Sequence, residues 1–169
     1  MNADEMRSIL TENEETYDYL FPNGMLLTDN EKVNASYYPL IKKWNCMNFC
    51  GYKLFTHPRQ KLHTAADGSL GFALVGHAFN PLSPENEVSE RRILEKALLL
   101  YRENEASFIE YFNQWTGLFA LLVFDGENVR IYGDAAGMYT VFYGMHNGKI
   151  YCASHTKLLG DICGLEFDP

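Results

Sequence analysis

Between Gly117 and Ala153 the chain alternates short apolar runs with turn signals, and this pattern constrains the fold more than any other feature. The run from Leu118 to Phe124 is entirely apolar, so both faces of the strand that it predicts must be buried. Asp-Gly-Glu-Asn at 125–128 and Asn-Gly at 147–148 are typical of tight hairpin turns. The pattern therefore predicts antiparallel strands at 118–124, 128–132, 140–145 and 149–153.

The rest of the chain carries signals for both helices and strands. Apolar residues recur at helical spacing in three segments, which predicts helices at 3–20, 90–101 and 107–112. Strands are expected at 25–28, 49–57 and 70–79, the last entered through a hairpin turn at Asp67-Gly68. Helices segregated from antiparallel hairpins indicate an α+β fold, and 169 residues suit a single domain.

Composition and charge exclude several functional classes. Hydrophobic residues make up 47% of the chain, which is typical of a globular protein. A net charge of -8 argues against nucleic acid as a partner, because binding phosphates requires a basic face. The acidic start of the chain does not resemble a secretion signal, and no apolar run is long enough to cross a membrane. We therefore expect a cytoplasmic protein with no membrane partner.

The four cysteines do not form a recognisable metal or disulfide pattern. Cys46 and Cys50 lie near His57 and His63 in the sequence, but their spacing fits none of the common zinc-site patterns. Without an export signal, a disulfide framework is not expected either. We predict buried thiols, no metal site and no cofactor.

Four motifs in a fixed order carry a family resemblance: Val75-Gly-His-Ala-Phe-Asn80, Gly117 to Asp125, Gly133-Asp-Ala-Ala-Gly137 and Ala153-Ser-His-Thr-Lys-Leu-Leu159. This order is similar to the end of the glutaminase domain of asparagine synthetases, which are class II glutamine amidotransferases. The resemblance covers about residues 74–159. It implies the four-layer αββα sandwich of two antiparallel sheets found in N-terminal-nucleophile hydrolases. Residues 1–169 would form one such domain, with 1–20 as an additional N-terminal helix and no synthetase domain.

The resemblance also defines the chemistry that an active member performs. Its first residue is a cysteine whose thiolate attacks the glutamine amide. An asparagine and a glycine in the motif N-G-E stabilise the oxyanion, and an arginine binds the substrate carboxylate. This chain begins Met1-Asn2, and the expected first strand at 21–27 contains no cysteine. Val75 replaces the asparagine and His77 the glutamate, whereas Gly76 is retained. We therefore expect no catalytic residue.

A remodelled ligand pocket is expected around Gly76, His77, Asn80 and Lys53. Lys53 is the nearest counterpart of the substrate-binding arginine, and the nearest counterparts of the amine-binding acid are Glu85 and Glu87. His77 has two interpretations, a base or a hydrogen-bonded polar residue. Asn80 also has two, a ligand donor or a cap of the following loop.

Three further motifs are interpreted as structural. Asp134 and Gly137 are expected to shape a turn. Cys50-Gly51 resembles the opening of an active family member, but cleavage there would remove the first strand, so Cys50 is expected to be a strand thiol. Ser154 and His155 are expected to point to opposite faces of a strand, which excludes a nucleophile–base pair.

The predicted function is a degenerate glutaminase-like domain without glutamine hydrolysis. It would act as a structural or regulatory module for an asparagine-synthetase-type, ATP-dependent domain in cis or in trans. Two alternatives remain open at this point: an active glutamine amidotransferase produced by N-terminal processing, and an amino-acid-binding module. Homo-oligomerisation is compatible with all three.

Overall fold

A computed structural model describes residues 8–9, 12–33, 39–83, 89–126 and 128–165. The chain divides into two compact units, one made of residues 1–60 with 141–169 and the other of residues 61–140. Each unit contains one antiparallel sheet, so the protein is a mixed α/β structure with two antiparallel sheets. Within the described ranges, no helix combines the length and the apolar character needed to span a membrane.

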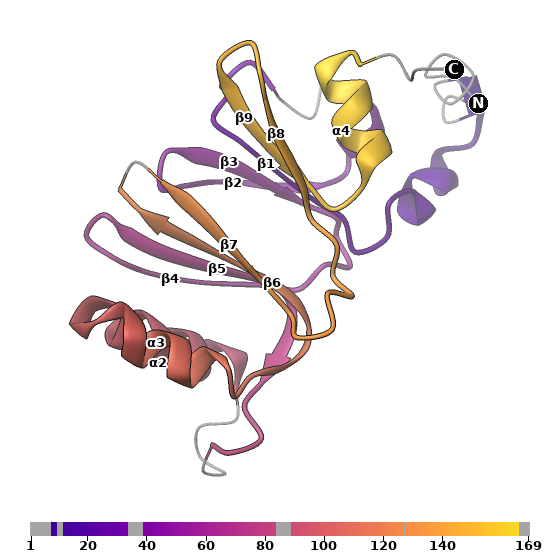
Figure 1. Ribbon diagram of the computed structural model, residues 1–169. Helices are drawn as coiled ribbons and strands as arrows, with labels where there is room; N and C mark the ends of the chain where they lie inside the picture. The colour runs from indigo at the N-terminus through magenta and orange to yellow at the C-terminus, as the bar shows by residue number, and fades with distance from the viewer. Residues whose placement is uncertain (1–7, 10–11, 34–38, 84–88, 127, 166–169) are drawn as a thin grey trace. The chain divides into compact units, whose positions relative to one another are not determined.

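The first unit is a five-stranded sheet with strand order β2-β3-β1-β9-β8. Its strands are β1 (Met25–Thr28), β2 (Asn45–Phe49), β3 (Tyr52–Thr56), β8 (Phe142–His146) and β9 (Lys149–Ala153). Two 3-10 helices, η1 (Glu14–Tyr19) and η2 (Pro39–Ile41), and the α-helix α4 (Thr156–Cys163) complete the unit. Figure 1 shows α4 beside the β8–β9 hairpin.

Strand β1 is the central strand of this sheet because its short sequence Met-Leu-Leu-Thr is buried at every position. It pairs with β3 on one side and with β9 on the other. Leu26 packs with Phe55, Tyr151 and Leu158 of α4 in one apolar cluster. Strand β1 is therefore held by neighbours that lie far apart in the sequence.

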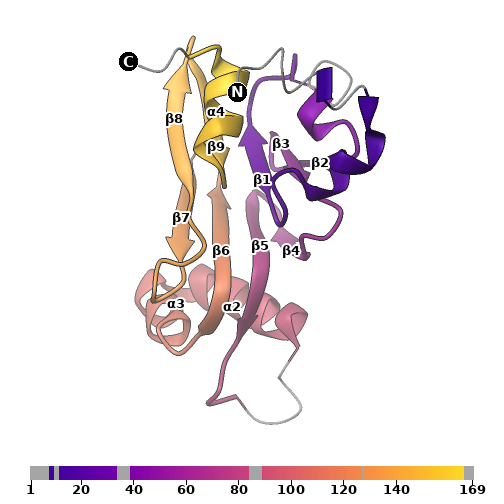
Figure 2. The same ribbon diagram turned by 90° about the vertical axis from the view of Figure 1, so that its right-hand side faces the viewer.

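The second unit is a four-stranded sheet with order β4-β5-β6-β7 and two helices. Figure 2 shows the long strands β5 and β6 crossing the two helices. The elements are β4 (Leu62–Asp67), β5 (Leu70–Phe79), α2 (Glu90–Glu103), α3 (Glu105–Phe112), β6 (Thr116–Asp125) and β7 (Val129–Gly133).

The core of the second unit lies between its sheet and its helices. Alternate residues of β5 and β6, including Phe72 and Leu121, pack with α2 and with Phe108 of α3. The intervening residues, such as Val75 and Leu122, are fully buried as well. This confirms burial on both faces for residues 119–124 of the apolar run at 118–124, whereas Leu118 is 45% exposed.

Most predicted elements are present within a few residues of their expected bounds. The strands at 25–28, 70–79, 118–124, 128–132, 140–145 and 149–153 and the helices at 90–101 and 107–112 are confirmed. Of the helix predicted at 3–20, residues 3–7 and 10–11 lie outside the described residues. Its C-terminal part is the 3-10 helix η1 rather than an α-helix, started by the Asn13 side chain, which accepts a bond from the Glu15 amide.

The single strand predicted at 49–57 is wrong, because this region contains the hairpin β2–β3. Cys50 (φ 49°) and Gly51 (φ 81°) form its two-residue turn, and Phe49 pairs with Tyr52 across it. Positive φ at both central residues is the geometry of a type I′ turn. Cys50 is therefore a turn residue and not the strand thiol that we expected. Helix α4 was not predicted at all.

Candidate functional site

Gly76 is required by the close approach of two strands. It lies in β5 with φ +105°, and a Cβ atom at this position would be 2.3 Å from the carbonyl oxygen of Leu118 in β6. The Gly76 N–H donates to the carbonyl of Lys61 at 2.9 Å. A side chain would therefore collide with β6, and the amide that an oxyanion hole would need is already hydrogen-bonded.

His77 is hydrogen-bonded to the first residue of α2. Its Nδ1 lies 3.1 Å from Glu90 Oε1, and His63 Nε2 lies 3.8 Å from the other oxygen of the same carboxylate. Burial alone would raise the pKa of Glu90, but the hydrogen bond with His77 and the positive field of His63 and Lys61 hold it below its ordinary value. These contacts agree with the second interpretation of His77, a hydrogen-bonded polar residue.

Asn80 caps the loop that follows β5, as the simpler interpretation predicted. Its Oδ1 accepts a hydrogen bond from the Leu82 amide at 2.9 Å, and its Nδ2 donates to Gln114 Oε1 at 3.1 Å. Asn80 is 2% exposed. Both ends of its amide therefore have protein partners, which leaves little capacity for a ligand.

Lys53 lies in the first unit, in a row of side chains that crosses three strands. It pairs with Asn48 of β2 on one side and with Thr28 of β1 on the other, so the three side chains share a face of the sheet. The Lys53 ammonium donates to the backbone carbonyls of Glu31 at 2.5 Å and Val33 at 3.0 Å. Lys53 thereby ties β3 to the segment that follows β1.

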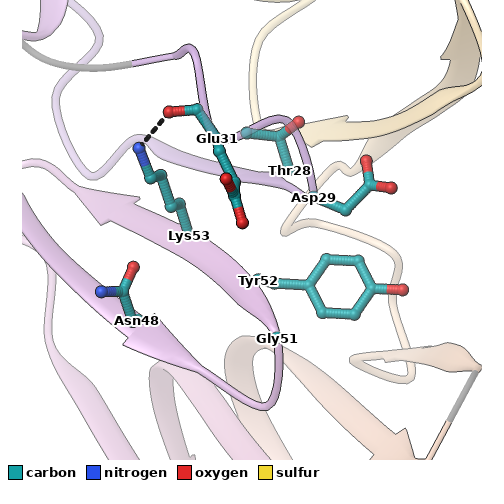
Figure 3. Close-up of a pocket in the computed structure, with 7 residues that line it drawn as sticks. All are labelled: Thr28, Asp29, Glu31, Asn48, Gly51, Tyr52 and Lys53. Carbon is teal, nitrogen blue, oxygen red and sulfur yellow. Dashed lines mark hydrogen bonds between the residues drawn. The ribbon is translucent and has the colours of Figure 1, made fainter.

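This row borders a hollow of about 410 Å³, which is the candidate functional site (Figure 3). A volume of several hundred Å³ is ordinary for a small-molecule site. The residues that line it come from the end of β1, the segment after it, and the β2–β3 hairpin: Thr28, Asp29, Glu31, Asn48, Gly51, Tyr52 and Lys53.

The segment after β1 is fixed in position by side-chain hydrogen bonds. Asp29 Oδ1 accepts from the Ile150 amide at 2.7 Å. Asn30 Nδ2 donates to the Tyr151 hydroxyl at 2.7 Å, and the Asn30 amide donates to Thr28 Oγ1 at 3.0 Å. The wall of the hollow is therefore anchored to β9 independently of any ligand.

Sequence reasoning identified only Lys53 among the residues around this hollow. Gly76, His77 and Asn80 belong to the unit of residues 61–140, and Lys53 belongs to the other unit. Glu85 and Glu87 lie outside the described residues. A signal for the missed residues was present in Asp29-Asn30, because Asp and Asn side chains commonly bond the backbone at the end of a strand. The row of Asn48, Lys53 and Thr28 could not be predicted without the register of the three strands.

The start of β1 carries no nucleophile. The Met25 amide donates to Ser154 Oγ at 2.8 Å, and Ser154 Oγ lies 2.8 Å from His155 Nδ1. The expectation that these two side chains point apart is wrong, because the chain leaves β9 and enters α4 between them. Burial lowers the pKa of His155. The Ser154 hydroxyl bridges β9, β1 and the cap of α4, which is a structural role.

The thiols are poor candidates for nucleophiles. The prediction of buried thiols is confirmed for Cys152 and Cys163 but is wrong for Cys46, which is exposed, and Cys50 is half-buried. Partial desolvation still raises the pKa of Cys46, Cys50 and Cys163, and burial raises that of Cys152 to about 12. The thiolate is the reactive form. Over the part of the chain that the structure describes, no group of three or more His, Cys, Asp or Glu side chains is arranged to hold a metal ion.

Asp134 shapes the turn after β7, as expected. Its carboxylate accepts hydrogen bonds from the amides of Ala136, Met138 and Tyr139 at 3.1, 3.0 and 2.8 Å, and the Gly137 amide donates to its carbonyl at 2.9 Å. Burial would raise the pKa of this carboxyl, but the backbone N–H groups hold it below its ordinary value. The Asp134 carboxylate is thus occupied by hydrogen bonds with backbone amides.

Comparison with known proteins adds no family assignment. No protein-family model matches the sequence, and a search of curated proteins finds no match.

Proposed function

We propose that this chain is a glutaminase-like domain that does not hydrolyse glutamine and that acts as a structural or regulatory module for an ATP-dependent, amide-forming domain. The observation that carries the proposal is the Gly76 amide. The family motif supplies two oxyanion donors, the asparagine side chain and the glycine N–H. Val75, which replaces the asparagine, has no side-chain donor. The other, the Gly76 N–H, donates to the Lys61 carbonyl at 2.9 Å. Losing one such donor typically costs an enzyme a factor of about 10²–10³ in kcat.

The position of β1 supports the same proposal, because it concerns the place where the nucleophile of an active family member would lie. The strand starts at Met25, its four residues are all buried, and it lies between two neighbouring strands. A nucleophile of this family would stand at the start of that strand. Here the Met25 amide is hydrogen-bonded to Ser154, and all four thiols lie elsewhere with raised pKa values.

The finer fold that we propose is the αββα sandwich of N-terminal-nucleophile hydrolases. Each sheet has one face that packs against helices. Its other face is also apolar, with Leu27 and Leu54 in the first sheet and Val75 and Leu122 in the second. Exposing such faces to water would cost about 25 cal/mol per Å², and packing them against each other would avoid that cost.

Ammonia release from glutamine tests the proposal. We expect the purified chain to release no more ammonia than a buffer blank, with or without prior treatment by a thiol alkylator. Release that the alkylator abolishes would contradict the proposal. Intact-mass spectrometry in the same experiment tests the alternative of N-terminal processing, which requires a shortened chain that begins with Cys, Ser or Thr.

A further inference from the structure

Strand β8 forms an unprotected edge of the first sheet. It is the last strand in the order β2-β3-β1-β9-β8, and Figure 2 shows it beside β9 at the margin of that sheet. Its sequence Phe-Tyr-Gly-Met-His contains no Lys, Arg, Asp, Glu or Pro, and it pairs with β9 at all five positions without a bulge. Natural edge strands usually carry charges, proline or bulges that prevent pairing with another chain. Strand β8 has none of these features.

Two large apolar side chains of β8 are exposed to solvent. Tyr143 is 76% exposed and Met145 is 75% exposed. Alternate residues of a strand point to the same face, so these two side chains form one apolar patch beside the open edge. The opposite edge of the sheet, β2, exposes Asn45, Cys46 and Asn48 instead. Of the two edges of this sheet, β8 is therefore the one where pairing with another strand would cover large apolar side chains.

The turn of the β8–β9 hairpin determines which backbone groups of β8 face outward. Residues 147–148 have positive φ and form a two-residue turn, and His146 pairs with Lys149 across it. In such a hairpin the flanking pair exchanges both of its hydrogen bonds, and hydrogen-bonded pairs alternate along the two strands. The N–H and C=O groups of Tyr143 and Met145 therefore point away from β9. No backbone partner for them is found in the part of the chain that the structure describes.

We propose that β8 pairs with β8 of a second copy of this chain, antiparallel and around a two-fold axis at Gly144. In this register Tyr143 lies opposite Met145 of the second copy, and Met145 lies opposite its Tyr143. The outward N–H and C=O groups of these residues then form the hydrogen-bonded pairs of the new ladder. A thioether beside an aromatic ring is a favourable contact. Each contact occurs twice, as a two-fold interface requires. This inference does not depend on the absence of glutamine hydrolysis.

Charge and buried area determine how strong this dimer is. The register brings no like charges together, because Phe142 lies opposite His146 and β8 has no acidic or basic side chain besides that histidine. A large side chain that is three-quarters exposed can bury on the order of 150 Å², so the four side chains of Tyr143 and Met145 in the two copies would bury on the order of 600 Å². This is below the roughly 1,200 Å² of a standard stable interface. We therefore expect a weak, reversible dimer.

Sedimentation equilibrium of the full chain tests whether it dimerises. We expect a monomer–dimer equilibrium with a Kd between about 10 µM and 1 mM, as suits a small interface. Association should be several-fold tighter in about 0.5 M than in about 0.05 M NaCl, because salt screens the repulsion between two chains of net charge -8. A chain that stays monomeric at about 1 mM, that forms a trimer, or that associates less tightly in high salt would overturn the proposal.

Two matched variants locate the interface. Met145→Lys places a charge on the open edge, which is a common natural way of blocking strand pairing, and we expect it to raise the Kd of the dimer at least tenfold. Leu99→Lys makes the same change of charge at an exposed apolar residue of α2 and should leave the Kd unchanged. An unchanged Kd in Met145→Lys, or an equal loss in Leu99→Lys, would overturn the proposal. Because both side chains are exposed, both variants should fold normally, which their thermal unfolding curves check.

A cross-link tests the register without weakening the edge. Residues 144 of the two copies would form a pair without hydrogen bonds, with Cα atoms about 4.5 Å apart, a separation that a disulfide can bridge. A Cβ at Gly144 meets nothing within 4 Å, so Gly144→Cys should fold. Under mild oxidation we expect several-fold more disulfide-linked dimer from this variant than from the natural chain, which controls for the exposed Cys46. Equal amounts from the two chains would contradict the two-fold axis at Gly144.

Discussion

Replacement of Asp134 by alanine should strongly destabilise the chain. The carboxylate is 6% exposed and accepts hydrogen bonds from three backbone amides, those of Ala136, Met138 and Tyr139. Each buried donor left without a partner costs about 1–3 kcal/mol. The alanine side chain is shorter than that of aspartate, so water can enter the site and replace some of these hydrogen bonds. We therefore expect a total loss of about 3–5 kcal/mol in the free energy of unfolding.

The isosteric variant Asp134→Asn separates the lost hydrogen bonds from the lost volume. Its amide oxygen can still accept from Ala136 and Met138, whereas its NH₂ group would face the Tyr139 amide. We expect this variant to lose roughly half as much stability as Asp134→Ala, about 2 kcal/mol. Urea unfolding followed by circular dichroism at pH 7 measures both. A loss below about 1 kcal/mol for the alanine variant would refute the reasoning.

The same carboxylate predicts a pH dependence with a definite sign. The backbone N–H groups hold the pKa of Asp134 below its ordinary value, so the stabilisation is present above the unfolded pKa, which is about 3.9. It is lost as the pH falls through the lower folded pKa. The stability difference between the natural chain and Asp134→Ala should therefore shrink below about pH 3.9. A difference that stays constant into strong acid would contradict the assignment.

Two other perturbations follow from the structure. Gly76→Ala should cost at least about 3 kcal/mol of unfolding free energy, because its Cβ would lie 2.3 Å from the Leu118 carbonyl. Gly133→Ala, where a Cβ meets nothing within 4 Å, is the matched control, and equal losses would refute the close approach. Burial lowers the pKa of His57 and of His155, so folding favours their neutral forms. The stability that they contribute is present above the unfolded pKa of about 6.5, begins to fall there, and is lost as the pH falls through the lower folded pKa. His57→Gln should flatten the fall in stability between about pH 7.5 and 5.5, and an unchanged slope in that variant would count against the effect.

Local sequence signals predicted the strands and turns that are defined by short-range patterns. The apolar run at 118–124 and the Asn-Gly turn at 147–148 determine their structures through short-range patterns, and both are confirmed. The helix α4 was missed because the motif at 153–159 has few turns of helical periodicity. Its end is marked by Gly164 in the left-handed conformation, φ 62°, a signal that the sequence contained.

The candidate site was harder to predict from the sequence, because its residues become neighbours only through the pairing of strands. Asn48, Lys53 and Thr28 become neighbours only once β2, β3 and β1 are aligned. The turn at Cys50-Gly51 was interpreted as part of a strand, which hid this register. Similarly, the partner of His77 is Glu90, thirteen positions later in the chain, and no local pattern predicts such a contact.

Amide hydrogen exchange at Gly76, measured by NMR with and without saturating glutamine, tests the central claim most directly. If the Gly76 N–H is held by the Lys61 carbonyl as the structure describes, its exchange should be slowed at least about 100-fold relative to an unprotected amide, and glutamine should leave its chemical shift unchanged. Exchange at the rate of an unprotected amide, or a glutamine-induced shift accompanied by ammonia release, would show that the oxyanion donor is free and that the proposed loss of hydrolysis is wrong.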